Sequence, residues 1–215
     1  RRRVSLMVTC LGDLFFPEVG FSIVRLLRKH DVVVDVPPAQ TCCGLPLFNS
    51  GYHAEARAVA ARTVELFRDS EHVVVPSGSC AWMVKHEYPG LLAETGLAKL
   101  AGQVAASTHE FSQFLVRVLG ATRFTSAVPG RVTYHDGCSG LRELKIKEQP
   151  RALLAAVPGL QLVEMHGTDT CCGSGGLFPV KFPDISDAMV SAKVANAAAV
   201  APDLVLAGDV GCLMN

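Results

Sequence analysis

The sequence is poor in the features that mark membrane, secreted and nucleic-acid-binding proteins. No apolar run approaches the length of about 18 residues that a membrane-spanning helix needs, and no signal-peptide pattern opens the chain. The 20 acidic and 20 basic residues cancel, so no excess charge points to nucleic acid or to an anionic membrane. We therefore expect a cytoplasmic protein that has no transmembrane segment and binds no nucleic acid.

Two familiar cofactor motifs are also missing. No Gly-x-Gly-x-x-Gly motif follows the first expected strand, so no nicotinamide or flavin pocket is indicated. No two of the eight cysteines have the Cys-x-x-Cys spacing that is usual for structural zinc. Ser77 and Ser79 lack a recognisable base and acid partner, and we name no catalytic residue.

The sequence does contain material for a packed core, together with its eight cysteines. A content of 49% hydrophobic and 19% charged residues indicates a compact protein with a well-packed core. The length of 215 residues is enough for two modest domains or one large one. Disulfides are disfavoured, because small secreted disulfide scaffolds are poor in core and a bridge between adjacent cysteines strains the backbone. The alternative of eight buried cysteines that act as small hydrophobic residues does not explain their spacing. We expect metal-ligating thiolates in a reducing compartment.

The cysteine spacing repeats, which indicates a duplicated unit. Thr41-Cys42-Cys43-Gly44 occurs again as Thr170-Cys171-Cys172-Gly173. One cysteine precedes each pair, by 32 positions in the first half and by 33 in the second, and one follows it, by 37 and 40 positions. The scheme includes every cysteine: Cys10, Cys42, Cys43 and Cys80 in the first half, and Cys138, Cys171, Cys172 and Cys212 in the second.

Segments with strand and helix patterns alternate in both halves. This alternation predicts an α/β fold made of two tandem Rossmann-like βαβ repeats with parallel sheets, related by a pseudo-two-fold duplication. The expected strands are 3–9, 31–36, 72–75, 131–135, 160–165 and 204–207. The expected helices are 17–29, 52–68, most of 81–119 with breaks at Pro89-Gly90 and near Ser107, a helix from about 141, and 184–200.

Two cysteine-rich domains are expected, 1–120 and 131–215, joined by a linker of small and polar residues at 121–130. The sequence starts at Arg1 without an initiator methionine and stops three residues after Cys212. We therefore expect trimmed ends and a missing C-terminal helix. Each cysteine loop follows an expected strand, and the carboxyl ends of parallel strands meet at one edge of a sheet. The four sulfurs of each half are thus predicted to converge.

Four converging thiolates suit either zinc or an iron–sulfur cluster. Adjacent cysteines can bind different irons of a cluster more easily than they can fill two corners of one tetrahedral ion. Gly44 and Gly173 permit the tight backbone that each vicinal pair needs, and we expect them to lie beside the centres. His135 is a candidate to hydrogen-bond a cluster sulfur or to ligate a metal, and the alternative is a capping or packing histidine.

The motifs together resemble a known family over nearly the whole chain. Cys…Cys-Cys-Gly…Cys, present twice, is similar to the cysteine-rich CCG domains of heterodisulfide reductase, of glycolate oxidase iron–sulfur subunits and of the lactate-utilisation protein A family. The last is favoured by three stretches of local sequence: Thr9 to Gly20 (TCLGDLFFPEVG), Thr41 to Pro46 (TCCGLP) and Pro76 to Cys80 (PSGSC).

The resemblance implies an iron–sulfur electron-transfer subunit in the oxidation of L-lactate to pyruvate. Such a subunit would be part of an oxidoreductase rather than a complete enzyme, and its partners would be a ferredoxin-like iron–sulfur protein and a further subunit. The eight cysteines would then hold one cluster per repeat, of the 4Fe–4S type. In the heterodisulfide reductase branch a further cysteine stands at the positions of Ser77 and Asp209, so each half here offers four thiols instead of five.

Two other functions are kept as alternatives. One is a scaffold subunit whose cysteines hold structural zinc. The other is a thiol–disulfide redox protein similar to heterodisulfide reductase, which would require an accessible cysteine pair of low pKa.

Overall fold

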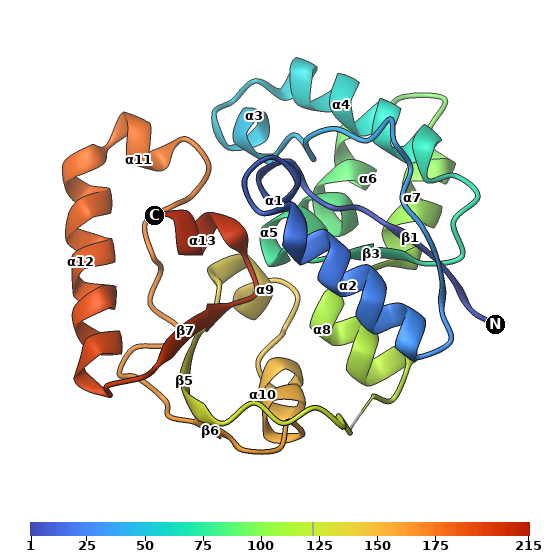
Figure 1. Ribbon diagram of the computed structural model, residues 1–215. Helices are drawn as coiled ribbons and strands as arrows, with labels where there is room; N and C mark the ends of the chain where they lie inside the picture. Colours follow the sequence, from blue (N-terminus) through green and yellow to red (C-terminus); the bar gives the residue numbers. More distant parts are fainter. Residues whose placement is uncertain (122) are drawn as a thin grey trace. The chain divides into compact units, whose positions relative to one another are not determined.

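The computed structural model describes residues 1–121 and 123–215 and divides into two units, Arg1–Phe111 (unit 1) and Ser112–Asn215 (unit 2). Each unit has its own parallel sheet (Figure 1). The prediction of an α/β fold with two parallel-sheet repeats is confirmed. The domain limits 1–120 and 131–215 stay predictions, and residue 122, inside the expected linker 121–130, lies outside the described residues.

The sheet of unit 1 has the strand order β2-β1-β3-β4, and all its strands are parallel. The central strand β3 is completely buried, as expected for a strand covered on both faces. Three of the strands match segments expected from the sequence, but β4 falls where a break near Ser107 was expected between helices. The strands are β1 (Arg3–Leu6), β2 (Val33–Asp35), β3 (Val73–Val75) and β4 (Thr108–Glu110).

Helices cover both faces of this sheet. The crossover helix α2 has the expected bounds, with Pro17 in its first turn and Arg28 and Lys29 in its last, where cations complement the helix dipole. On the other face, α4 contacts both α6 and α7. The helices are α1 (Cys10–Phe15), α2 (Pro17–Lys29), α3 (Leu45–Asn49), α4 (His53–Leu66), α5 (Gly78–Trp82), η1 (Met83–Glu87), α6 (Tyr88–Leu91), α7 (Ala98–Ser107) and α8 (Phe111–Gln113), the last of which begins at the final residue of unit 1.

The expected helix break at Pro89-Gly90 is wrong. Both residues lie inside α6, which continues directly from the π-helical segment η1. The amide of Tyr88 bonds to the carbonyl of Met83, five residues back, and this wider turn brings the chain to Pro89, which has no N–H to donate. The chain leaves the helix only after Leu91.

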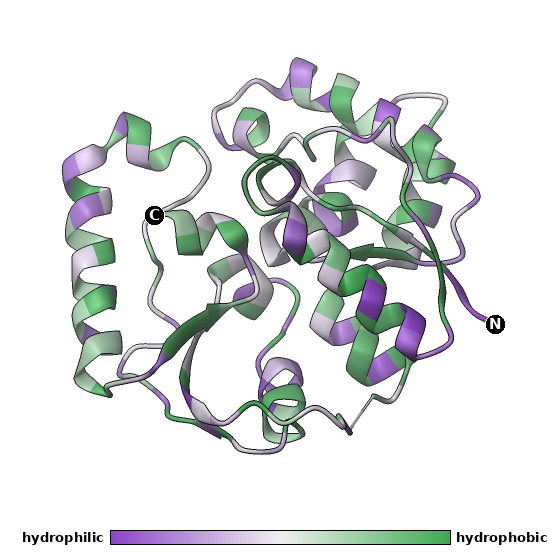
Figure 2. Ribbon diagram, viewed as in Figure 1, coloured by the Kyte–Doolittle hydropathy of each residue, from purple (hydrophilic) through white to green (hydrophobic). Residues whose placement is uncertain are grey.

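The sheet of unit 2 has the order β6-β5-β7, which repeats the β2-β1-β3 order of unit 1. The duplication indicated by the cysteine spacing is therefore also present in the topology. Figure 2 colours β3 and β7 as hydrophobic strands, whereas α12 mixes hydrophilic and hydrophobic residues. The elements are η2 (Phe114–Val118), β5 (Gly130–His135), α9 (Cys138–Arg142), α10 (Glu148–Ala155), β6 (Leu160–Leu162), α11 (Phe178–Lys181), α12 (Pro183–Ala199), β7 (Leu204–Ala207) and α13 (Val210–Met214).

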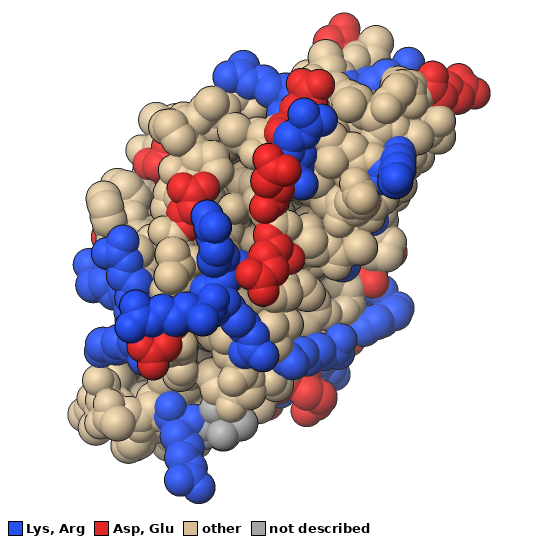
Figure 3. All heavy atoms as spheres, turned by 90° about the vertical axis from the view of Figure 1, so that its right-hand side faces the viewer, with Lys and Arg blue, Asp and Glu red and all other residues tan. Residues whose placement is uncertain are grey.

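The surface carries charges of both signs. On the face shown in Figure 3, basic and acidic side chains occur together among larger uncharged areas. This mixture agrees with the balance of 20 acidic and 20 basic residues. Within residues 1–121 and 123–215, no helix has the length and apolar character needed to cross a bilayer.

Candidate metal centres

All eight cysteines lie in segments that follow the carboxyl ends of strands. In each unit the first cysteine begins a short helix, the vicinal pair lies in an irregular loop, and the last cysteine lies in another short helix. The strands that precede them are β1, β2 and β3 in unit 1 and β5, β6 and β7 in unit 2, which are neighbours in their sheets. This arrangement brings cysteines that are far apart in sequence to one edge of each sheet, as predicted.

The four sulfurs of unit 1 form a continuous series. Cys42 accepts hydrogen bonds from the thiols of Cys10 and Cys43, and these bonds lower the pKa of Cys42 to about 2. Sγ of Cys43 lies 3.3 Å from Sγ of Cys80, so its single proton is shared between Cys42 and Cys80. Its hydrogen bond to Cys42, the bond to Cys80 and burial all raise the pKa of Cys43. The series therefore runs Cys10–Cys42–Cys43–Cys80, with Cys43 buried and Cys10 exposed.

The sulfurs of unit 2 repeat this order. Cys171 accepts hydrogen bonds from the thiols of Cys138 and Cys172, which lower its pKa to about 2. Cys172 also hydrogen-bonds to Cys212, and the pKa of Cys212 falls to about 7 because of that bond and a smaller contribution from His135. No cysteine is in a disulfide. Each unit thus presents four neighbouring free thiols. The most readily ionised are Cys42 in unit 1 and Cys171 in unit 2, followed by Cys212.

The Cys-Cys-Gly turn has the same geometry in both units. Gly44 and Gly173 have φ of +84° and +89°, a left-handed conformation that costs little only for glycine. Their amides donate to Sγ of Cys42 and of Cys171, each at 3.4 Å. Amide hydrogen bonds to sulfur stabilise a thiolate and tune the potential of a cluster bound to it. That the two glycines lie beside metal centres stays a prediction.

A side-chain donor fixes the carbonyl of the second cysteine in each pair, a feature that the sequence patterns did not predict. The buried hydroxyl of Tyr88 donates to the carbonyl of Cys43 at 2.8 Å. The amide of Asn215 donates to the carbonyl of Cys172 at 2.9 Å. Both donors lie a few residues beyond the last cysteine of their unit, but they differ in type and spacing, so the repeat does not reveal them.

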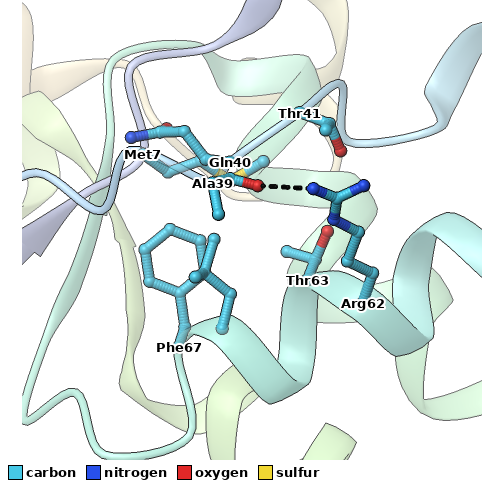
Figure 4. Close-up of a pocket in the computed structure, with 8 residues that line it drawn as sticks. Met7, Ala39, Gln40, Thr41, Arg62, Thr63 and Phe67 are labelled. Carbon is cyan, nitrogen blue, oxygen red and sulfur yellow. Dashed lines mark hydrogen bonds between the residues drawn. The ribbon is translucent and has the colours of Figure 1, made fainter.

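Gln40 supports the loop before Cys42, and it was also missed. Its side chain accepts from the amide of Val8 at 2.8 Å and donates to the carbonyls of Leu6 and Pro37. It thereby connects the end of β1 to the loop that leads to the cysteine pair. Figure 4 shows the neighbouring hollow, where Arg62 of α4 donates to the carbonyl of Ala39 at 3.3 Å. A single glutamine in a loop carries no sequence signal for such a role.

The backbone before Cys10 is strained. Thr9, which precedes the cysteine, has φ of +75°, and this is an outlier for a β-branched residue. Its carbonyl accepts the amide of Asp13 at 2.9 Å and so begins α1. Such strain persists only where the surroundings enforce it, and it is concentrated at functional sites.

Ser77 and Asp209 act as helix caps. Ser77 Oγ accepts the amide of Cys80 at 3.2 Å, and Asp209 Oδ1 accepts the amide of Gly211 at 3.0 Å. These are the positions at which the heterodisulfide reductase branch has a further cysteine. Here each of them begins the short helix that carries the last cysteine of its unit.

Unit 2 has a charged support beside the loop that leads to Cys138. The buried carboxylate of Asp136 receives two hydrogen bonds from Arg151, at 2.8 and 2.9 Å. Arg151 also bonds to Glu164, and it lies over the ring of Tyr134. A buried carboxylate needs an opposite charge and hydrogen-bond donors, and Arg151 supplies both to Asp136. It fixes the backbone between His135 and Cys138.

His135 lies next to two of the thiols of unit 2. It is 4% exposed, and neither ring nitrogen has a hydrogen-bond partner. One ring nitrogen and Sγ of Cys172 and of Cys212 all lie within 4.8 Å of one another. Among residues 1–121 and 123–215, this is the single group of three such ligand atoms that is so compact.

The sulfur arrangement in each unit can be compared with the geometry of a single metal ion. One tetrahedral zinc requires all four sulfurs to be about 3.8 Å apart, given its ~2.3 Å bonds. In unit 1 no three sulfurs are as compact as the group around His135, although each has a sulfur neighbour in the series. Thiolates bound to different irons of a cluster lie farther apart than those on one ion. The eight cysteines, with amides directed at Cys42 and Cys171, are a suitable donor set for two metal centres.

Comparison with known proteins shows the same duplication. The cysteine-rich CCG domain matches residues 4–85 and again residues 132–215. The chain is 42% identical over 214 residues to lactate utilization protein A 2 of Bacillus cereus (strain Q1), with 99% of this chain and 88% of the relative covered. It is 45% identical over 213 residues to lactate utilization protein A of Shouchella clausii, with 99% and 89% covered, and 44% identical over 214 residues to that of Halalkalibacterium halodurans, with 99% and 87% covered. The chain therefore belongs to the lactate utilization protein A family, and it carries two copies of the CCG cysteine-rich domain.

Proposed function

We propose that this chain takes part in lactate utilisation as an iron–sulfur electron-transfer subunit. Each unit would hold one cluster, of the 4Fe–4S type, through its four cysteines. The observation that carries the proposal is the convergence of Cys10, Cys42, Cys43 and Cys80 in unit 1, repeated by Cys138, Cys171, Cys172 and Cys212 in unit 2. The names of its relatives support the link to lactate.

A bound cluster supplies a site that accepts and releases one electron at a time. The residues of this chain would hold and tune it. The cysteines provide the thiolates, and the amides of Gly44 and Gly173 stabilise negative charge on Cys42 and Cys171. Tyr88 and Asn215 hold the carbonyls of Cys43 and Cys172, and so keep both thiols in place. The described residues offer no recognised base or hydride acceptor, so lactate oxidation itself is assigned to a complex in which this chain is one subunit.

The partners proposed are a ferredoxin-like iron–sulfur protein and a further subunit of the complex, in the cytoplasm. Exposed Cys10 supports this, because the thiol lies at the surface, where a redox partner can approach the unit 1 centre. Next to it, Leu14 and Phe15 of α1 are also exposed.

Anaerobic purification followed by iron and acid-labile sulfide assays tests the proposal. We expect both elements in stoichiometric amounts, visible absorption, and a paramagnetic resonance signal after reduction. Colourless, iron-free protein from cells with intact cluster assembly would refute the proposal.

A zinc scaffold is the second candidate, because one observation favours it. His135, Cys172 and Cys212 form a compact set with the donor types of a structural zinc site. Elemental analysis separates the two functions: zinc at stoichiometric level without visible absorption would favour the scaffold. The thiol–disulfide alternative gains less support, since each low-pKa cysteine is hydrogen-bonded between two other thiols of its own quartet.

A further inference from the structure

His135 occupies a distinctive position at the carboxyl edge of the unit 2 sheet. It is the last residue of β5, paired in register with Ala207 of β7, and it stands three residues before Cys138. Its side chain is directed into the interior, with only 4% of the residue exposed. The loop that follows it is anchored by the bond pair between Asp136 and Arg151. His135 is therefore held rigidly beside the thiols.

The imidazole lacks the partners that a packing histidine has. Neither Nδ1 nor Nε2 has a hydrogen-bond partner at normal distance and angle, although both are buried, and the polar group with which the ring interacts is the thiol of Cys212, whose pKa it lowers. A buried donor or acceptor left without a partner costs about 1–3 kcal/mol, and most buried side-chain polar atoms are satisfied. The interpretation of His135 as a capping or packing residue predicts at least one hydrogen bond of normal geometry to the surrounding protein, and neither nitrogen has one.

The neighbours of the ring are instead two soft metal ligands. A ring nitrogen and the sulfurs of Cys172 and Cys212 lie within 4.8 Å of one another. A metal bound by these two sulfurs and the ring nitrogen would accept the lone pair of that nitrogen. Imidazole nitrogen and thiolate sulfur are a familiar combination in protein metal sites, for zinc and for iron–sulfur centres alike.

Unit 1 has no equivalent ligand. The residue three positions before Cys10 is Met7, which is also buried and lies just beyond the end of β1. A thioether has no lone pair comparable in basicity to an imidazole nitrogen, and the compact three-atom group occurs in unit 2 alone among the described residues. The two repeats thus share four cysteines each but differ at this position.

We propose that a ring nitrogen of His135 binds the metal centre of unit 2 together with Cys172 and Cys212, which makes this centre a mixed nitrogen–sulfur site while the centre of unit 1 is ligated by thiolates only. The inference rests on the proposed function, in which both quartets hold metal. Its consequence is that the duplicated units carry chemically distinct centres, each with its own spectrum and potential.

The test is pulsed paramagnetic resonance on reduced protein in which histidine is labelled with ¹⁵N. The Cys43→Ser background interrupts the unit 1 quartet, so the spectrum reports on unit 2. We expect the strong hyperfine coupling of a directly bonded nitrogen, and we expect its loss in His135→Met, which copies the residue of unit 1. The Cys172→Ser variant, which leaves only the unit 1 centre, should lack the coupling. His166→Gln, at an exposed histidine of the same unit, should retain it.

The outcomes separate this inference from the proposed function. Iron and sulfide in unit 2 without a strongly coupled histidine nitrogen, or with the same spectrum in His135→Met, overturn the inference and leave the proposed function standing. Unit 2 that contains zinc and no iron refutes the iron–sulfur function. X-ray absorption at the zinc edge then decides on His135: a nitrogen ligand lost in His135→Met supports its ligation, and an all-sulfur shell overturns it. Circular dichroism of His135→Met verifies that the sheet is intact.

Discussion

At the scale of single residues, the two glycines of the Cys-Cys-Gly turns differ in how tightly they are enclosed. Both have positive φ, so a side chain at either position costs about 1–2 kcal/mol through the backbone. A Cβ on Gly173 would also lie 3.0 Å from the carbonyl oxygen of Ser186 and 3.2 Å from Cβ of Met189, whereas a Cβ on Gly44 would make ordinary contact with Val59 at 3.4 Å.

We therefore expect Gly44→Ala to lower the free energy of unfolding by about 1–2 kcal/mol and Gly173→Ala to lower it by more. Anaerobic urea titration measures both. Gly102→Ala is the control, because Gly102 lies in helix α7 with open space around it, and alanine there should stabilise the protein by about 0.5–1 kcal/mol. Equal losses at Gly44 and Gly173 would contradict the steric argument.

The hydroxyl of Tyr88 gives a second prediction at this scale. It is the buried partner of the Cys43 carbonyl, and burial raises its pKa, so it stays a neutral donor. Tyr88→Phe keeps the ring but leaves the carbonyl unpaired, which should cost about 1–3 kcal/mol of stability. Tyr52→Phe, at an exposed tyrosine, should change stability by less than about 0.5 kcal/mol. Thermal unfolding of both variants without oxygen is the measurement, and a Tyr88→Phe variant as stable as Tyr52→Phe would show that this bond contributes nothing.

The ligating positions could be predicted from the sequence, but their supports could not. Cysteine has few roles, and its repeated spacing made all eight positions stand out. Gln40, Tyr88 and Asn215 act through backbone carbonyls, and any residue with a donor of the right reach can do so. Such contacts depend on where loops pass in three dimensions, which the local sequence does not encode.

At the scale of elements, sequence periodicity and apolar runs identified the long helices and several of the strands. The helix over Pro17–Lys29 and the strand Leu204–Ala207 have their expected bounds, because amphipathic spacing dominates in the first and a short apolar run in the second. The strand β4 was missed because it has only three residues, all polar, between helical segments. The Pro89 break was wrong because a π-helical turn precedes it, and that turn has no sequence signature.

His109, in the short strand β4, should make the stability of the protein depend on pH. Burial and the nearby charges of His72 and Lys85 lower the pKa of His109 to about 4, from about 6.5 in an unfolded chain. Between these two pH values His109 binds a proton in the unfolded chain but not in the folded protein. The free energy of unfolding should therefore fall as the pH drops from about 6.5 to about 4. We expect His109→Gln to remove this part of the pH dependence.

Chemical unfolding at a series of pH values between about 7 and about 4 measures this effect. His86→Gln, at an exposed histidine of the same unit, is the matched control and should retain the slope of the unmodified protein. If the free energy of unfolding of His109→Gln kept the same dependence on pH, the response would belong to other groups.

At the scale of the whole molecule, the chain divides into two compact units, and each contains a complete quartet of cysteines. The repeated strand order follows from the same alternation of elements that predicted the fold, so the duplication was visible from the sequence. What the sequence did not reveal is how far the repeats have diverged. Unit 1 adds β4 and a buried Met7, whereas unit 2 has the Asp136–Arg151 pair and His135 beside its thiols.

This separation predicts that the centres are lost one at a time. Cys43→Ser removes a central thiol of the unit 1 series, which bridges Cys42 and Cys80, while every ligand of unit 2 remains. We expect iron and sulfide to fall to about half, with the resonance signal of unit 2 retained and the circular dichroism unchanged. Cys172→Ser should give the complementary result.

Spectroscopy and metal analysis of the two variants, prepared side by side without oxygen, distinguish independent centres from a shared one. Loss of all iron from either variant would mean that the quartets assemble as one unit, against the contact division. If the secondary structure collapsed as well, the thiols would be structural elements of the fold, as the zinc scaffold requires. If the chain transfers electrons through two distinct centres, each variant should stay folded and keep the spectrum of one centre. The spectrum that remains should differ between the two variants.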